Sequence, residues 1–306
     1  MADKNTNNRK VLLIGNGIYR AFHGDEESWN NVLNYLCRNL LKGKLSELPE
    51  CSPILLFEYM HTQMTESEQF ETEVAKCLKE MYCQPEFSKY SDEINGLIWS
   101  HFDTVVTTNV DNRFEWIESK KKWKLESGGK WKFSTYRRKV VEHDNRDLKI
   151  YYIHGEISKP KSICFGLAHY LGEYRNHYEN TISKKSIEKI DCENSKKMLS
   201  PKDIIEKKAG CEPWSQYLYN NPVDIVGFGL NDSEIDVWWI LKLRMLKNCK
   251  NLVRYFYPSM DGNAKKILPL LKAFDVEPKV IPCSSYREFY KIYFEDFAGD
   301  NRLKKE

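Results

Sequence analysis

The sequence predicts a doubly wound α/β fold, in which helices cover both faces of a mostly parallel sheet. Short apolar runs rich in β-branched residues recur along the chain, several of them end directly in glycine or polar residues, and helical repeats of apolar residues lie between them. This alternation is typical of parallel sheets with helical crossovers. We expect one domain over residues 1–306, with a helical insertion at 25–100 and a polar insertion at 170–221.

Composition favours some classes of protein and leaves others, nucleic-acid-binding proteins among them, without support. Of the 306 residues 41% are hydrophobic, so the chain can bury a large core. The 47 Lys and Arg against 44 Asp and Glu lack the basic excess typical of nucleic-acid-binding proteins. A polar N-terminus without a long apolar run predicts a cytoplasmic protein that spans no membrane. Nine cysteines without a CxxC pair predict reduced thiols and no zinc site.

The first predicted strand, residues 11–14, leads into Gly15-Asn16-Gly17 and then into three predicted helices of the first insertion. Ser28 is the expected N-cap of the first helix and Gly43 its stop. Apolar residues at helical spacing define the three helices: Trp29, Val32, Leu33, Leu36 and Leu40; Phe70, Val74, Leu78 and Met81; and Ile94, Leu97 and Ile98. Because the insertion is long for a crossover, we expect it to cap a crevice.

The next two predicted strands are residues 104–108 and 150–153, which are apolar or β-branched. Between them, residues 123–141 alternate between aromatic and basic side chains around Gly128-Gly129, which predicts a β-hairpin. The second insertion is rich in Lys, Glu, Asn and Ser, and its lysine pairs most simply form a solvated face.

The C-terminal half repeats the order of strand, glycine turn and helix. A strand at 223–226 leads into Gly227-Phe228-Gly229 and a helix from Ser233 to about Leu246. Predicted strands at 252–257 and 280–281, and helices at 264–274 and 286–297, complete the alternation.

Polar or glycine residues follow four predicted strands. They are Gly15, Asn16 and Gly17; Thr108, Asn109 and Asp111; His154; and Gly227, Gly229, Asn231 and Asp232. Because the carboxyl ends of parallel strands converge on one crevice, we expect these residues to meet there. The sequence therefore predicts a site that consumes a nucleotide.

The glycines and the Asn/Asp pair each have two interpretations. Gly15 and Gly17 let backbone N–H groups approach a pyrophosphate, but the third glycine of the dehydrogenase fingerprint is missing, and a plain tight turn also explains them. Asn109 can hold a ribose hydroxyl or a water, and Asp111 can accept from an amide ligand. The alternative for this pair is an Asx cap of a helix beginning near Asn112.

The histidine and the last motif also have two interpretations. His154 can serve as a general base, because the unperturbed pKa of histidine lies near neutrality, or it is structural. The residues from Gly227 to Asp232 can form a rim for a second ribose or an adenine. Asp232 is also the expected N-cap of the helix that follows.

Together, the motifs GNG, TTNVD, IHG and GFGLND resemble the sirtuin family, most closely its bacterial, zinc-free branch of NAD-degrading antiphage defence effectors. The resemblance implies a Rossmann-like fold and a set of roles. These are Gly15 and Gly17 under the NAD pyrophosphate, Asn109 at the ribose or attacking water, Asp111 at the nicotinamide amide, His154 as base, and Gly227, Gly229 and Asp232 along the adenosine half.

Departures from the sirtuin pattern narrow the implied activity. Asn16 replaces the usual alanine, Thr108 stands where deacylases carry glutamine, Gly229 replaces a serine, and the paired-cysteine zinc module is missing. The resemblance therefore implies metal-free hydrolysis of NAD to nicotinamide and ADP-ribose, in a homo-oligomer or with a partner such as a translocase ATPase. An NAD-dependent protein deacylase and a non-enzymatic NAD or ADP-ribose sensor or partner module are the alternatives.

Overall fold

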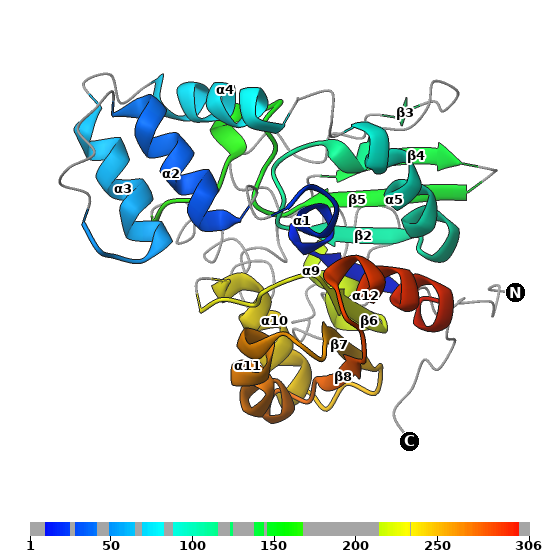
Figure 1. The fold of residues 1–306 in the computed structure, drawn as a ribbon. Helices are drawn as coiled ribbons and strands as arrows, with labels where there is room; N and C mark the ends of the chain where they lie inside the picture. Colours follow the sequence, from blue (N-terminus) through cyan, green and yellow to red (C-terminus); the bar gives the residue numbers. More distant parts are fainter. Residues whose placement is uncertain are drawn as a thin grey trace, which may run out of the picture.

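A computed structural model of the chain describes residues 10–24, 28–41, 49–64, 69–82, 88–115, 123–124, 138–143, 146–167, 214–232 and 234–299 (Figure 1). These residues form an eight-stranded sheet in the order β3-β4-β5-β2-β1-β6-β7-β8. The strands from β5 to β8 in this order pair in parallel, while β3 and β4 form an antiparallel edge. The predicted doubly wound α/β fold is confirmed.

The parallel strands overlap the predicted apolar runs, and β5 and β8 begin earlier than predicted. Their bounds are β1 (Val11–Ile14), β2 (Thr104–Thr107), β3 (Trp123–Lys124), β4 (Arg138–His143), β5 (Arg146–Tyr152), β6 (Val223–Val226), β7 (Val253–Pro258) and β8 (Glu277–Ile281). Every residue of β1, β2 and β6 is buried, as expected for central parallel strands. The predicted hairpin is present as β3 paired with β4, and its turn at Gly128-Gly129 lies outside the described residues.

The direction of winding reverses at β1. The chain passes from β1 to β2 and β5 on one side, and then returns to build β6, β7 and β8 on the other. This is the strand order of the Rossmann fold, in which ligands bind at the carboxyl ends of the strands beside the reversal. The turns after β1 and β6 therefore border the position where this topology favours a ligand.

Between β1 and β2 the described residues form the helices α1 (Gly17–His23), α2 (Trp29–Leu40), α3 (Pro53–Gln63), α4 (Phe70–Tyr82) and α5 (Ser88–His101). Ser28 caps α2 as predicted, because its Oγ accepts from Asn31 N. The helix α3 was not predicted, although Ser52 and Pro53 mark its start: the Ser52 side chain accepts from Leu55 N. The predicted stop at Gly43 and most of the second insertion, residues 168–213, lie outside the described residues.

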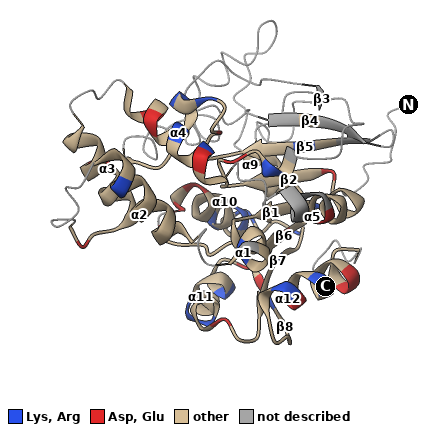
Figure 2. Ribbon diagram, turned by 45° about the horizontal axis from the view of Figure 1, so that its top comes forward, with Lys and Arg blue, Asp and Glu red and all other residues tan. Residues whose placement is uncertain are grey.

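The other α-helices of the described residues are α9 (Trp214–Asn220), α10 (Ile235–Leu246), α11 (Gly262–Ala273) and α12 (Tyr286–Ile292), the last continuing as a π-helical turn over Tyr293–Phe297. Among the described ranges, no helix has the length and apolar character needed to cross a bilayer. Figure 2 shows basic and acidic residues interspersed over the described helices.

The three largest apolar clusters of the described residues lie on the two faces of the sheet and in the insertion. In β1, Leu12 and Ile14 belong to one core, while Val11 and Leu13 belong to the core on the opposite face, as the alternation of strand side chains requires. Figure 1 shows α2, α3 and α4 packed together beside the sheet. Their shared core includes Val110 from the loop after β2, and Ile157, Ile163 and Phe165 from the loop after β5. The insertion thus packs on loops at the carboxyl edge.

Candidate functional site

The loop after β2 carries a buried amide at the carboxyl edge of the sheet. The backbone N–H of Asn109 donates to Thr107 Oγ1 at 3.1 Å, which orients the residue. Its side chain is buried, and among the described residues Asn109 Nδ2 has no hydrogen-bond partner. Leaving a buried donor unpaired costs about 1–3 kcal/mol, and such groups in native structures call for an explanation, of which a missing ligand is one. Thr108, next to it, is half-buried.

Asp111 forms an internal ion pair with Arg113. Arg113 Nε donates to Asp111 Oδ1 at 2.7 Å and Arg113 Nη2 donates to Asp111 Oδ2 at 3.1 Å. The backbone N–H of Arg113 also donates to Asp111 Oδ1, so the Asx interpretation of this residue is present at the start of a short 3₁₀ helix over Arg113–Glu115. Both carboxylate oxygens that were expected to serve a ligand therefore accept from Arg113.

Arg113 joins the loops after β1 and β2, and the sequence reasoning missed it. Its Nη2 donates to Asn16 Oδ1 at 3.2 Å, and its guanidinium lies 3.9 Å from the centre of the Tyr19 ring. The Arg113 side chain is fully buried. An arginine two residues after a strand-end aspartate was the available signal, since this spacing permits a bidentate pair. Asn16 and Asp111, two predicted site residues, are thus connected through Arg113.

The turn after β5 holds His154 in a fixed backbone position. Cys164 N donates to the His154 carbonyl oxygen at 2.9 Å. Gly155 has a φ of +89°, and a Cβ placed there would lie 2.0 Å from the Ser162 carbonyl oxygen. The glycine of the IHG motif is therefore required by the backbone itself.

The imidazole of His154 faces two carboxyl groups from the start of α10. His154 Nε2 lies 3.3 Å from Asp236 Oδ2 and 3.5 Å from Glu234 Oε2. The side chains of His154 and Asp236 are 3% and 2% exposed, and that of Glu234 is 12% exposed. Burial raises the pKa of Glu234 to about 7; His154 opposes this shift and Asp236 adds to it. The carboxyl group of Glu234 thus titrates near neutral pH.

Glu234 and Asp236 were not predicted as site residues, although the acidic run after Asn231 was a visible signal. The ligand atoms of His154, Glu234 and Asp236 all lie within 4.8 Å of one another. Imidazole nitrogen and carboxylate oxygen are ligand types that divalent cations accept, so these three residues could hold one.

The turns after β1 and β6 are in backbone contact. Gly17 N donates to the Gly227 carbonyl oxygen at 3.0 Å. A Cβ at Gly15 or at Gly17 would lie 2.7 Å from that same oxygen. Gly227 has a φ of +60°, and a Cβ there would lie 2.1 Å from Tyr290 Oη. Close packing of the two turns therefore requires glycine at these positions, and the N–H of Gly17 is directed at Gly227.

A cavity of about 130 Å³ opens beside these turns, at the carboxyl ends of β6 and β7. Gly17, Gly227 and Gly229 border it, together with several aromatic side chains that include Tyr257 and Tyr286. Arg20 and Asp261 supply a positive and a negative group to its wall. The cavity combines apolar rings with a few polar groups, which is the usual character of a small-molecule site.

The rim predicted after Gly227 is exposed at Gly229, Asn231 and Asp232. The Asn231 carbonyl oxygen accepts from Glu234 N at 3.0 Å and from Trp238 Nε1 at 2.9 Å. The predicted capping role of Asp232 is wrong, because α10 begins at Ile235 and Glu234 is its N-cap. The turn closed by Asn231 delays the start of the helix by two residues relative to the prediction.

Comparison with models of known protein families finds no match, and comparison with curated proteins finds none either.

Proposed function

We propose that the chain hydrolyses NAD at the carboxyl edge of its sheet, releasing nicotinamide and ADP-ribose. One observation carries this proposal: the glycine turns after β1 and β6 meet at the point where the strand order reverses, beside a cavity lined by aromatic side chains and Arg20. Dinucleotides bind at this point in doubly wound sheets.

The lining of the cavity suits the adenine ring of the substrate. Aromatic rings can stack on a purine, and Arg20 can pair with a phosphate oxygen, for which its guanidinium is geometrically suited. Gly227 and Gly229 border this space, and Asn231 and Asp232 extend its rim. Gly15, Asn16 and Gly17 would then lie nearer the pyrophosphate.

The chemistry requires little covalent assistance. Nicotinamide leaves as a neutral molecule from a cationic precursor, so the enzyme needs to stabilise an oxocarbenium-like ribosyl centre and to deliver water to its opposite face. Asn109 would orient a ribose hydroxyl or the water with its buried amide, and Thr108 and Asp111 would flank it. His154 would remove the proton of the water, directly or through a ribose hydroxyl, for a gain of about 10²- to 10⁴-fold. The reaction as proposed uses no metal.

From the resemblance alone, we further propose a cytoplasmic role in antiviral defence by abortive infection. An NADase of this kind depletes an essential cofactor, so it has to be restrained when idle. A homo-oligomer, or a complex with a partner such as a translocase ATPase, would provide that restraint.

The test is to incubate wild type, Asn109→Ala and His154→Ala with NAD and to quantify nicotinamide by chromatography. We expect nicotinamide release to fall at least about 100-fold in both variants. His61→Ala is the matched histidine control, because His61 lies in α3 and stacks on Phe70. Equal release from wild type and both site variants would overturn the assigned roles.

The products separate the alternatives. Formation of 2′-O-acyl-ADP-ribose from an acylated peptide would identify a deacylase instead. Binding of NAD or ADP-ribose without any release of nicotinamide, even in the assembled state, would identify a sensor.

A further inference from the structure

Three side chains with little exposure to solvent meet where α10 begins, beside the turn after β5. They are His154, Glu234 and Asp236, and they are 3%, 12% and 2% exposed. One ligand atom from each lies within 4.8 Å of the other two. Carboxyl groups outnumber the imidazole in this cluster, and charges taken out of water are stable when they are paired or coordinate a metal ion.

The distances in the cluster match a metal centre better than a hydrogen-bonded ion pair. His154 Nε2 lies 3.3 Å from Asp236 Oδ2 and 3.5 Å from Glu234 Oε2. A charge-assisted hydrogen bond brings nitrogen and oxygen to about 2.7–2.9 Å. Two atoms bound at about 2.0–2.2 Å to one tetrahedral cation lie about 3.3–3.6 Å apart. The imidazole nitrogen therefore has the separation from each carboxylate oxygen that a shared cation would impose.

A second observation at the same place also indicates a ligand. Glu234 Oε2 is buried, and it accepts no hydrogen bond from any described residue. A buried acceptor without a donor destabilises a fold, and an ion that binds there is one recognised reason for a protein to keep it. This oxygen is the same one that lies 3.5 Å from His154 Nε2.

The backbone holds two of the three side chains in place. Asp236 Oδ1 accepts from Val237 N at 2.8 Å in the first turn of α10, while Oδ2 of the same carboxylate faces His154. The carbonyl oxygen of His154 accepts from Cys164 N at 2.9 Å. Contacts of this kind orient metal ligands before the metal binds, which raises the affinity of the site.

The donor set selects the class of cation. Mg²⁺ and Ca²⁺ prefer oxygen ligands alone, whereas one imidazole nitrogen with two carboxylate oxygens suits a transition-metal cation such as Zn²⁺. We propose that His154, Glu234 and Asp236 bind one divalent transition-metal cation, and that this cation inhibits NAD hydrolysis. The inhibition rests on the proposed function, whereas the site does not. A cation on the imidazole lowers the proton affinity of the ring, and its charge opposes the positive charge that develops on the ribosyl carbon.

Calorimetric titration of the chelator-treated full chain with Zn²⁺, and separately with Mg²⁺, tests the site. We expect one Zn²⁺ per chain and at least about 10-fold weaker binding of Mg²⁺. Glu234→Gln and His154→Ala should each weaken Zn²⁺ binding at least about 100-fold, and the control His61→Ala should bind as wild type does. Absence of stoichiometric Zn²⁺ binding to wild type would overturn the proposal, and so would unchanged binding in the folded site variants.

Cysteine thiolates also take up Zn²⁺, and the chain has nine cysteines. Absorption spectra of the wild-type chain with one equivalent of Co²⁺ in place of Zn²⁺ distinguish the two kinds of ligand, and they do not require any variant to fold. Nitrogen and oxygen ligands give visible bands alone, whereas thiolates add an intense charge-transfer band in the near ultraviolet. We expect the visible bands alone. The thiolate band would overturn the proposal.

Nicotinamide release tests the inhibition, with each protein compared with its own chelator-treated rate. One equivalent of Zn²⁺ should lower the release by wild type at least about 10-fold, and equal inhibition of Glu234→Gln should need at least about 100-fold more Zn²⁺. Unchanged or increased release by Zn²⁺-loaded wild type would overturn the inhibitory role. If Zn²⁺ binds but chelator-treated wild type releases no nicotinamide, the proposed function fails and the metal site stands. If nicotinamide is released but no Zn²⁺ binds, the metal site fails and the proposed function stands.

Discussion

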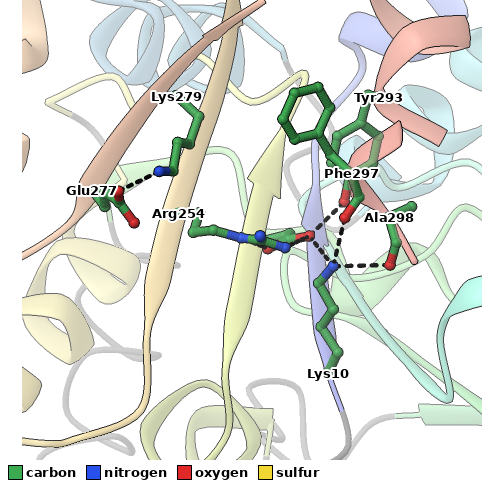
Figure 3. A network of polar contacts seen from close by, with 8 residues as sticks. Lys10, Arg254, Glu277, Lys279, Tyr293, Phe297 and Ala298 are labelled. Atoms are coloured by element: carbon green, nitrogen blue, oxygen red, sulfur yellow. Dashed lines mark hydrogen bonds and ion pairs between the residues drawn. The ribbon is translucent and has the colours of Figure 1, made fainter. Parts of the chain in front are cut away.

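Two buried clusters of charged residues lie at opposite ends of the parallel strands, and they differ in how their charges are matched. At the amino end, Asp224 of β6 is paired with two permanent cations, Arg254 and Lys10, which are labelled in Figure 3. Arg254 of β7 donates to both of its oxygens, at 2.8 and 3.0 Å, and Lys10 Nζ lies 2.7 Å from Oδ2. Tyr293 Oη also donates to Oδ2 at 2.8 Å. Both carboxylate oxygens of Asp224 therefore have hydrogen-bond or ion-pair partners.

At the carboxyl end, the acidic groups outnumber the groups that can carry a positive charge. Two carboxyl groups, Glu234 and Asp236, face the one titratable imidazole of His154. The nearby loop after β2 adds Asn109, whose amide nitrogen has no partner in the described part of the chain. The carboxyl-end cluster therefore contains groups that can exchange protons or accept a ligand.

The amino-end cluster contributes to stability, whereas the carboxyl-end cluster is suited to function. At the amino end Lys10 Nζ also donates to the carbonyl oxygens of Phe297 and Ala298, at 3.2 and 2.9 Å, so the cluster ties the C-terminal helical segment to β1 and β6. A fully satisfied network of this kind fixes structure. Unsatisfied polar groups cost stability, and proteins retain them where a ligand or a reaction needs them.

Asp224→Asn should have the largest effect on stability. It leaves the charges of Arg254 and Lys10 buried without their carboxylate, and we expect the free energy of unfolding to fall by about 3–5 kcal/mol. Guanidinium denaturation followed by circular dichroism measures this. The matched control is Glu277→Gln, which removes the ion pair with Lys279 on β8; both side chains are partly exposed, so the loss should stay below about 1 kcal/mol. Similar losses in the two variants would contradict the contrast between the clusters.

The central strands could be predicted from sequence, because a strand that is buried on both faces consists almost entirely of apolar and β-branched residues. Runs such as residues 11–14 and 223–226 contain apolar and β-branched residues, and their ends coincide with the glycine turns. The helix α3 escaped prediction because its apolar residues do not form one face: Leu55 is 50% exposed, while Phe57 and Met60 are buried. Periodicity indicates a helix only where one side is buried.

The site could be predicted in part for a similar reason. Gly155 and Gly227 have positive φ and no room for a Cβ, so local backbone geometry requires glycine there and makes the motifs visible. The partners of His154 could not be predicted in the same way, because Asp236 is 82 residues away from it along the chain. The fold brings them together, because α10 begins beside the turn that follows β5.

Glu234→Gln should change how stability depends on pH. The pKa of Glu234 is raised from 4.5 to about 7, chiefly by burial, with His154 opposing and Asp236 reinforcing the shift. For an acid with a raised pKa, the stabilisation is complete below the unfolded pKa of 4.5 and is lost as pH rises through about 7. Wild type should therefore lose about 3 kcal/mol relative to the Gln variant across this window.

Unfolding free energies of wild type and Glu234→Gln, measured between about pH 4 and about pH 8 with a chelator present, provide the comparison. Below pH 4.5 the free energies of unfolding of the two proteins should change with pH in the same way. Above pH 4.5 the free energy of unfolding of the Gln variant should rise relative to that of wild type. Parallel curves over the whole range would show that Glu234 does not titrate in this window. The carboxyl-end cluster would then resemble the permanently charged one.

Asn109→Ala should have the smallest effect on stability and yet a large effect on activity. Removing an unpaired buried amide relieves its desolvation cost, so the free energy of unfolding should change by less than about 1 kcal/mol, while nicotinamide release falls at least about 100-fold. The matched variant is Asn95→Ala in α5, because Asn95 Nδ2 donates to the Arg113 carbonyl oxygen at 2.8 Å. Truncation to alanine removes this buried hydrogen bond and should cost about 1–3 kcal/mol. If Asn109→Ala were instead the more destabilising of the two, Asn109 would be a structural residue with a partner in the folded chain, and the carboxyl end would lose the feature that most distinguishes it from the amino end.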